Sequence, residues 1–229
     1  MEKLSRNKVI EISSTTGDLS GLDLSGLDLS ELDLSGVNLK GSVLKKANLG
    51  YVNLSGAVLE NADLSGCDLS GANLTGANLK QAGVARADIR FSVLIGADLS
   101  GADLTEANLK LTNLSAAIVK GTELSNANLQ QVEAAAAKFT NAKMKGVNAY
   151  GASMAAADLS GAAMQGADLT KADLNTANLS GANLRGAQIL NTNLRAADLT
   201  NADLAGAKIS NSDFTRAKMD EGTRKIVGG

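Results

Sequence analysis

Hydrophobic and polar positions follow each other along this chain with a strict period of five residues. From Leu19, every step of five lands on an apolar residue as far as Met219, which divides the sequence into 41 units without an insertion or deletion. A second small residue, most often Ala, lies two positions before this central residue, with Asp or Asn commonly between them and Gly common at the fifth position. A helix repeats every 3.6 residues and a strand every two, so neither explains the pattern. It predicts a short extended segment followed by a turn, many times over.

The repeat predicts a stack of coils. In an extended segment the central and small residues point inward while Asp or Asn points outward, and Gly supplies the left-handed conformation of tight turns. If each unit turns the chain by a right angle, four units close a square coil, and coils stack about 4.8 Å apart. Residues 17–221 would then form about ten coils. The spacing alone does not separate a square coil from a triangular one.

The units "GADLS", "GANLT", "NADLS" and "KADLN" resemble the consensus of the pentapeptide-repeat family, over residues 17–221. This resemblance implies an all-β fold, a right-handed quadrilateral β-helix. It also implies a bacterial protein that acts through its surface, as do the DNA-mimicking family members that protect type II topoisomerases. Those members often end in a longer dimerising segment, which this chain lacks.

The two ends are expected to differ from the repeat, because a solenoid leaves unpaired backbone at its ends. Residues 1–16 carry apolar residues at partly helical spacing and are predicted to form an N-terminal cap, with a helix as one form it can take. Residues 222–229 are expected to be a short C-terminal tail. An exposed C-terminal coil leaves end-to-end dimerisation open. Positions held by Ala in later coils are Leu in the first coil, which indicates a wider or plugged end: Leu22, Leu27 and Leu32.

Large and small central residues alternate irregularly between residues 130 and 157, where Ala134 and Ala149 underfill the axis. We expect neighbouring Phe and Met to refill it, since Met adapts to irregular gaps; a bent or loosened coil is the alternative. Cys67 replaces a consensus Ala and is predicted to be a small inward filler. As the lone cysteine it can form no intrachain disulfide. The predicted core landmarks are Leu19, Cys67, Phe139, Met144, Met154 and Phe214.

Composition argues against catalysis. The chain has no His, the commonest general base and transition-metal ligand, and its Asp and Asn columns have the regularity of a solvated face. We therefore expect no enzyme activity, cofactor or metal. The 22 basic and 24 acidic residues give a net charge of −2, which favours neither specific nucleic-acid binding nor DNA mimicry. The sequence shows neither a secretory signal nor an apolar run of membrane-spanning length, so we expect a cytoplasmic location.

Residues 20 apart share a column if the coil is square, and one edge of the rod then gathers outward apolar residues. The compact part of this candidate patch is Phe91, Val93, Ile95 and Leu111, with Arg90 and Lys110 at its rim. Contiguous exposed apolar residues indicate a contact surface. We predict a non-catalytic interaction or scaffold module with an unidentified protein partner. The alternatives are a DNA mimic that binds gyrase, a homodimer through this edge or the C-terminal coil, and scattered apolar residues without a role. The full candidate patch is Tyr51, Phe91, Val93, Ile95, Leu111, Tyr150 and Leu190.

Overall fold

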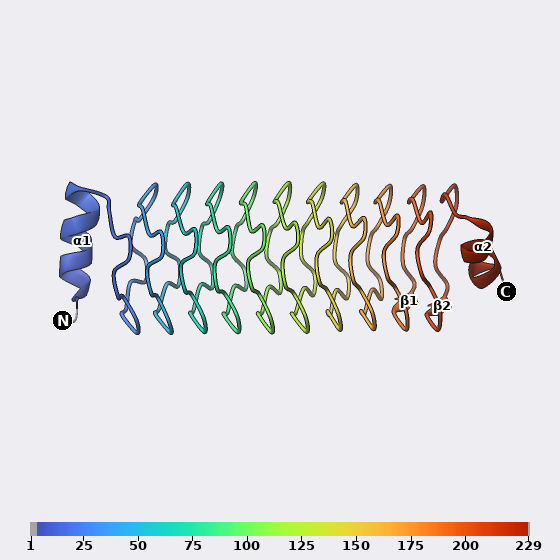
Figure 1. Ribbon diagram of the computed structural model, residues 1–229, viewed down its shortest axis with the longest axis horizontal. Coiled ribbons are helices and arrows are strands. Elements are labelled where there is room, and N and C mark those ends of the chain that lie inside the picture. Colours follow the sequence, from blue (N-terminus) through green and yellow to red (C-terminus); the bar gives the residue numbers. More distant parts are fainter. Residues whose placement is uncertain (1–3, 229) are drawn as a thin grey trace.

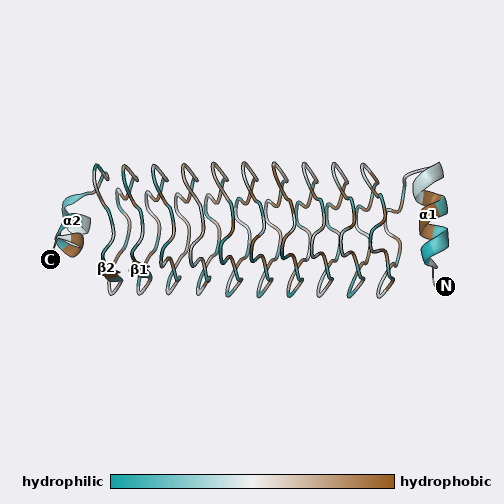
Figure 2. Cartoon of the chain, turned by 180° about the vertical axis from the view of Figure 1, so that it is seen from behind, coloured by the Kyte–Doolittle hydropathy of each residue, from teal (hydrophilic) through white to brown (hydrophobic). Residues whose placement is uncertain are grey.

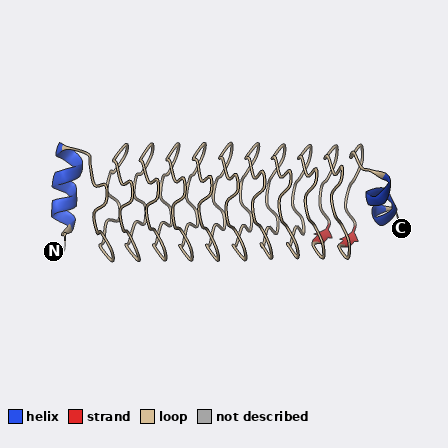
Figure 3. Ribbon diagram, in the orientation of Figure 1, coloured by secondary structure: helices blue, strands red, loops and turns tan. Residues whose placement is uncertain are grey.

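The computed structural model describes residues 4–228 and shows a rod of stacked coils with a helix at each end (Figure 1). The elements are α1 (Arg6–Thr15), β1 (Gln188–Leu190), β2 (Lys208–Ser210) and α2 (Glu221–Val227). Figure 3 draws most of the rod as loops and turns, because each side of a coil contributes only a short segment to the pairing. Residues 1–3 of the expected cap and residue 229 of the expected tail lie outside the described residues.

The coils are stacked in parallel with a register of twenty residues. Single-residue bridges join Asp18 to Asn38 and every later unit to the unit twenty residues on, and β1 pairs with β2 in the same register. The N–H of Leu19 donates to the carbonyl of Asn38 (2.8 Å), and the N–H of Asn38 donates back to the carbonyl of Gly17 (2.9 Å). Four units therefore close each coil, which confirms a quadrilateral β-helix.

Units with an outward Asp or Asn close their own turn through that side chain. The backbone N–H of Ser20 donates to Oδ1 of Asp18 (3.1 Å), and the same contact recurs along the rod. From Gly21 to Arg216, the fifth residue of every unit has a positive φ. The outward side chains also join neighbouring coils, since Nδ2 of Asn38 donates to Oδ1 of Asp18 (3.0 Å). Alternation of Asn with Asp thus replaces like-charge repulsion with hydrogen bonds.

The inward residues form one continuous core, and Figure 2 shows hydrophobic and hydrophilic residues alternating along the coils. The irregular stretch does not interrupt it, because the bridges continue through residues 133 and 153. In this coil Phe139 lies on the side opposite Ala149, and Met144 on the side opposite Ala134; all four are fully buried. Large residues thus offset small ones across the axis, as compensated packing predicts. Leu19, Cys67 and Met154 are buried as well.

Helix α1 plugs the N-terminal end. It begins after Ser5, whose side chain caps it, and it buries Val9 completely. The guanidinium of Arg6 donates to the terminal carbonyls of Asp28 (2.9 Å) and Ser30 (2.8 Å). The larger residues of the first coil pack partly buried against the same core: Leu22, Leu27 and Leu32.

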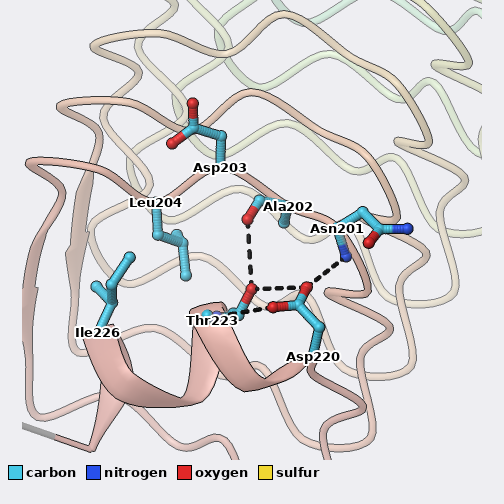
Figure 4. A pocket seen from close by; sticks show the side chains of 8 residues that line it. Asn201, Ala202, Asp203, Leu204, Asp220, Thr223 and Ile226 are labelled. Carbon is cyan, nitrogen blue, oxygen red and sulfur yellow. Dashed lines mark hydrogen bonds between the residues drawn. The ribbon is translucent and has the colours of Figure 1, made fainter.

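The C-terminal segment is a helix rather than the simple tail expected from the sequence. α2 begins after Asp220, whose carboxylate accepts the N–H groups of Thr223 (2.9 Å) and Asn201 (2.7 Å). The hydroxyl of Thr223 donates to the carbonyl of Ala202 (3.3 Å), so the helix is tied to the last coil (Figure 4). Phe214 is only half-buried, because no further coil covers it.

The two ends of the solenoid have opposite polarity. In each unit two N–H groups, such as those of Leu19 and Gly21, donate toward the C-terminal neighbour, while one, such as that of Asn38, donates backward. The first coil therefore presents an excess of carbonyls and the last an excess of N–H groups. Arg6 lies at the carbonyl-rich end and Asp220 at the N–H-rich end, so each end carries the complementary charge, as at the ends of a helix.

Candidate protein-binding surface

Tyr51, Gly71, Phe91 and Leu111 follow one another in a single column at one corner of the rod, and we call them the apolar ridge. The backbone keeps them in adjacent coils, since the N–H of Phe91 donates to the carbonyl of Lys110 (3.2 Å). Their side chains are unusually open: Tyr51 is 72% exposed, Phe91 58% and Leu111 42%. The structure thus places two of the predicted patch residues, Phe91 and Leu111, in contact range within one column.

Gly71 lets the ridge run without a gap. An ideal Cβ built on Gly71 would lie 2.5 Å from Cε1 of Tyr51, so the tyrosine ring lies directly over the glycine. A side chain at this position would collide with the ring. The ring therefore covers the coil between Tyr51 and Phe91, and the apolar surface extends over four successive coils.

The bulky ridge residues adopt a conformation that suits glycine. The φ angles of Tyr51, Phe91 and Leu111 are 56°, 61° and 60°, in the left-handed region that costs an L-residue roughly 1–2 kcal/mol. Because these side chains are exposed, their burial within this molecule does not offset that cost. The same conformation recurs at the fifth residue of every unit from Gly21 to Arg216, so the ridge is distinguished by the exposure of its apolar side chains.

The side of the rod that follows the ridge carries no charge over four coils. Here Ile95 is 40% exposed, and Val93 is half-buried between Asn73 and Asn113, with which it forms bridges. The first charged residue beyond is Glu133, which accepts a hydrogen bond from Nδ2 of Asn113 (2.7 Å). We call this the uncharged side, and its outward residues are Asn53, Ser55, Gly56, Asn73, Thr75, Gly76, Val93, Ile95, Gly96, Asn113, Ser115 and Ala116.

The opposite side of the same coils is charged. Lys45 pairs with Asp63 (3.0 Å) and Arg86 with Glu106 (2.8 Å). Depletion of charged residues together with exposed aromatic residues is the compositional mark of an interface centre. The rod is therefore two-faced, with one side suited to contact with a protein and the other to solvent. The charged residues of the second side in these coils are Lys45, Lys46, Asp63, Arg86, Asp103 and Glu106.

The rim of the ridge has one neutralised and one free charge. Arg90 holds Asp88 in a two-pronged contact, with Nε 2.8 Å from Oδ1 and Nη2 2.6 Å from Oδ2. This contact lowers the pKa of Asp88 and raises that of Arg90. The ammonium of Lys110 has no carboxylate within 4.0 Å among the described residues. Lys110 is thus available to a carboxylate of another molecule.

Two predicted patch residues stand apart from the ridge. Tyr150 and Leu190 are half-buried and belong to the column of Lys110, two and four coils further along. The Tyr150 ring lies beneath the ammonium of Lys171, 5.4 Å from Nζ to the ring centre, a favourable cation–π distance. The structure therefore divides the predicted patch into a continuous part, with Tyr51, Phe91, Val93, Ile95 and Leu111, and two separate residues.

Comparison with known proteins identifies the repeat. The chain matches the family of pentapeptide repeats in eight copies, over residues 18–56, 42–81, 85–121, 107–146, 137–175 and 177–216. The chain belongs to the pentapeptide-repeat family. No curated protein matches this chain significantly in sequence. Pentapeptide-repeat proteins are generally non-catalytic structural or interaction proteins.

Among solved structures, this pentapeptide-repeat protein is similar to HetL, a protein involved in heterocyst differentiation regulation from the cyanobacterium Nostoc sp. strain PCC 7120. The two superpose with a TM-score of 0.93 and 28% sequence identity, covering 97% of this chain and 99% of HetL. QnrB1, a plasmid-mediated fluoroquinolone resistance protein, gives a TM-score of 0.44 and 19% identity over 92% of this chain and 95% of its own. The HetL match thus covers nearly the whole of both chains.

The remaining features of this pentapeptide-repeat protein are structural. Burial raises the pKa of the Cys67 thiol to about 12, and its Sγ donates to the carbonyl of Leu44 (2.7 Å). Within residues 4–228 there is no group of three or more His, Cys, Asp or Glu that could hold a metal, and no helix there is long and apolar enough to cross a membrane. An open hollow of about 420 Å³ lies between α2 and the last coil (Figure 4). Three of its polar lining residues, Asn201, Asp220 and Thr223, make the hydrogen bonds that hold α2 against the last coil.

Proposed function

We propose that this protein is a non-catalytic interaction module that binds a protein partner through the apolar ridge and the uncharged side. The observation that carries the proposal is the exposure of the apolar ridge beside a side of the rod that carries no charge over four coils. Tyr51, Phe91 and Leu111 occupy left-handed positions where glycine is favoured, and their side chains are exposed. Contact with a partner would bury these side chains, and aromatic residues are the preferred anchors of such contacts.

The similarity to HetL supports a regulatory role for the module. HetL is involved in the regulation of heterocyst differentiation and resembles this chain over nearly its whole length. A rigid rod with one uncharged side can regulate a second protein by occupying or presenting a surface, without any chemical step. We infer that this chain acts in the same general manner.

DNA mimicry of the kind known in the family fits the surface less well. A mimic needs an unbroken negative surface, whereas the outward acids here are offset by basic residues of neighbouring coils. Examples are Lys80 with Asp98 (3.1 Å) and Arg185 with Asp203 (3.1 Å). The net charge of −2 agrees with this offset. Binding to gyrase is therefore a test outcome that would count against the proposed function.

The test compares three proteins as bait in a quantitative affinity capture from cells of the source organism. Phe91→Gly with Leu111→Gly removes the centre of the ridge but keeps the left-handed turns. Lys46→Gly with Asn126→Gly makes the same change at left-handed turns of the charged side. We expect the ridge variant to lose the partner and the control to retain it. Retention of every partner by the ridge variant, or capture of gyrase by all three proteins, would contradict the proposal.

A further inference from the structure

We infer that the apolar ridge and the uncharged side also bind a second copy of this chain, in an antiparallel dimer whose two-fold axis passes by Gly71. The inference rests on the proposed function, because it uses the same surface and names one occupant. It follows from the order of residues along the ridge column, which runs Glu31, Tyr51, Gly71, Phe91 and Leu111. The aromatic residues Tyr51 and Phe91 are symmetric about Gly71, and the free ammonium of Lys110 in the neighbouring column can complement Glu31.

The two-fold axis pairs each coil with the coil at equal distance on the other side of Gly71. The Tyr51 ring of each chain lies over its own Gly71, so the two Tyr51 rings meet each other at the axis, and the backbone of each Tyr51 lies in the layer of Phe91 of the second copy. Gly71 faces itself beneath the two Tyr51 rings. Glu31 lies beside Leu111 of the second copy. The exposed aromatic surface of both chains is therefore covered at once.

Charge selects this register among the alternatives. With the axis at Gly71, the free ammonium of Lys110 lies in the same layer as Glu31 of the second copy. Neither residue has an ion pair within the described chain. Arg90 then faces Gly50 of the second copy, which has no side chain to oppose it. An axis at Phe91 would instead set Arg90 against itself, and such like-charge contacts are unfavourable.

The uncharged side is large enough for a stable dimer. The accessible surface of the chain is 9821 Å², and one of four sides over four of about ten coils is on the order of 1,000 Å². A standard interface buries about 800 Å² on each partner.

The C-terminal coil is a poorer dimer site than the uncharged side. Two C-terminal ends brought together would face N–H groups with N–H groups, because each last coil has an excess of donors. α2 also covers one side of that coil through Thr223 and Asp220. A second copy on the uncharged side meets neither obstacle. It would compete with the protein partner for the ridge, so the partner binds only as the dimer separates.

A charge exchange tests the register by analytical ultracentrifugation over a range of protein concentrations. Lys110→Glu and Glu31→Lys should each weaken the dimer by about tenfold, because each turns two attractions into repulsions. The double variant should return to within about threefold of the wild type, since the pair is restored with its signs reversed. Lys46→Glu on the charged side is the control and should leave dimerisation unchanged. Failure of the double variant to recover would overturn the register.

Cross-linking with a short bismaleimide tests the axis on the full chain. Thr75→Cys lies in the coil of Gly71, so it faces residue 75 of the second copy across the axis and should cross-link rapidly. Ser115→Cys lies in the same column but two coils from the axis. It is therefore about 19 Å from the same residue of the second copy and should not cross-link. Native Cys67 does not react because it is buried with a pKa of about 12.

The outcomes separate this inference from the proposed function. A chain that is monomeric at all concentrations, or a cross-link at Ser115→Cys instead of Thr75→Cys, would overturn the dimer. The proposed function stands in that case if Phe91→Gly with Leu111→Gly still loses the partner. A dimer with the expected cross-link, together with partner binding that does not respond to this ridge variant, would overturn the proposed function alone.

Discussion

At the fifth position of a unit, the backbone and the side chain make opposite demands. The turn requires a positive φ, which favours glycine, whereas a contact surface requires a large side chain. Phe91 and Leu111 provide a large exposed side chain, although their positive φ favours glycine. Residues that serve contact rather than folding should be replaceable by glycine without loss of stability, and this gives a direct test of their role.

Phe91→Gly and Leu111→Gly should each leave the free energy of unfolding unchanged or raise it by up to about 1 kcal/mol. The relief of left-handed strain exceeds the entropy that glycine costs in the unfolded state. Urea unfolding measures the change. Lys46→Gly, at an equivalent turn of the charged side, should behave in the same way. A loss of stability above 1 kcal/mol at Phe91 alone would mean that its ring packs within the chain.

Gly71→Ala should be more disruptive than the same change at Gly76. Both glycines have positive φ, 68° and 65°, so alanine costs each about 1 kcal/mol through the backbone. Only at Gly71 would the added Cβ also collide with the Tyr51 ring, since an ideal Cβ on Gly76 has no atom within 4 Å. The near-ultraviolet signal of tyrosine should show an extra change for Gly71→Ala, because the exposed Tyr51 ring must move aside. Identical results for the two variants would contradict the position of the ring.

A coil is the smallest element that packs as a unit, and the irregular coil shows how. Phe139 lies opposite Ala149, so one large and one small side chain occupy the space of two leucines. Phe139→Leu should lower stability through a cavity, and Ala149→Leu should lower it through overpacking, each by roughly 1–3 kcal/mol. The double variant should recover at least 1 kcal/mol of the summed loss, as a double-mutant cycle would show. Strict additivity would indicate that the two residues do not share a space.

The end caps and turns make the elements sensitive to acid. The hydroxyl and backbone N–H of Ser30 lower the pKa of Asp28, and the backbone N–H groups of Thr223 and Asn201 lower that of Asp220. A lowered pKa in the folded state gives stability that is present above the ordinary value near 3.8 and is lost as pH falls through the folded value. Thermal melts should therefore shift downward below about pH 4.

Asp220→Asn tests the share of the C-terminal cap in this acid sensitivity. Asn at this position still accepts hydrogen bonds but does not titrate. The variant should be less stable at neutral pH and should show a weaker fall in melting temperature below about pH 4. Asp168→Asn, in a turn of the rod interior without a cap, is the matched control. An unchanged pH dependence in Asp220→Asn would contradict the role assigned to the Asp220 carboxylate.

At the scale of the whole molecule, the period of five residues predicts nearly all of the fold, because it runs without interruption from Leu19 to Met219. Grouping residues that are twenty apart into columns also predicts, from the sequence alone, that Phe91 and Leu111 lie together. The sequence could not show that the Tyr51 ring lies over Gly71, because this depends on a side-chain rotamer. It could not show α2 either, since a seven-residue helix is stable only through its contacts with the last coil.

The uncharged side was readable in principle. Reading the outward columns twenty residues at a time shows Asn, Ser, Thr, Gly, Val, Ile and Ala but no charge between residues 53 and 116. The signal is an absence spread over separate segments, so it becomes visible only once the four-unit coil is known. Recognition of a surface by depletion of charge needs the fold first, whereas recognition by aromatic residues does not.

The central claim is that the ridge and the uncharged side are the working surface of this rod, and a photo-cross-linking scan in the cells of the source organism tests it most directly. A benzophenone amino acid at Thr75 or Ser115 lies on the uncharged side, and at Ser65 or Thr105 on the charged side, at equivalent positions of the unit. We predict adducts, with a protein partner or a second copy, from Thr75 and Ser115 and none above background from Ser65 and Thr105. Adducts confined to the charged side, or equal from both sides, would contradict the account.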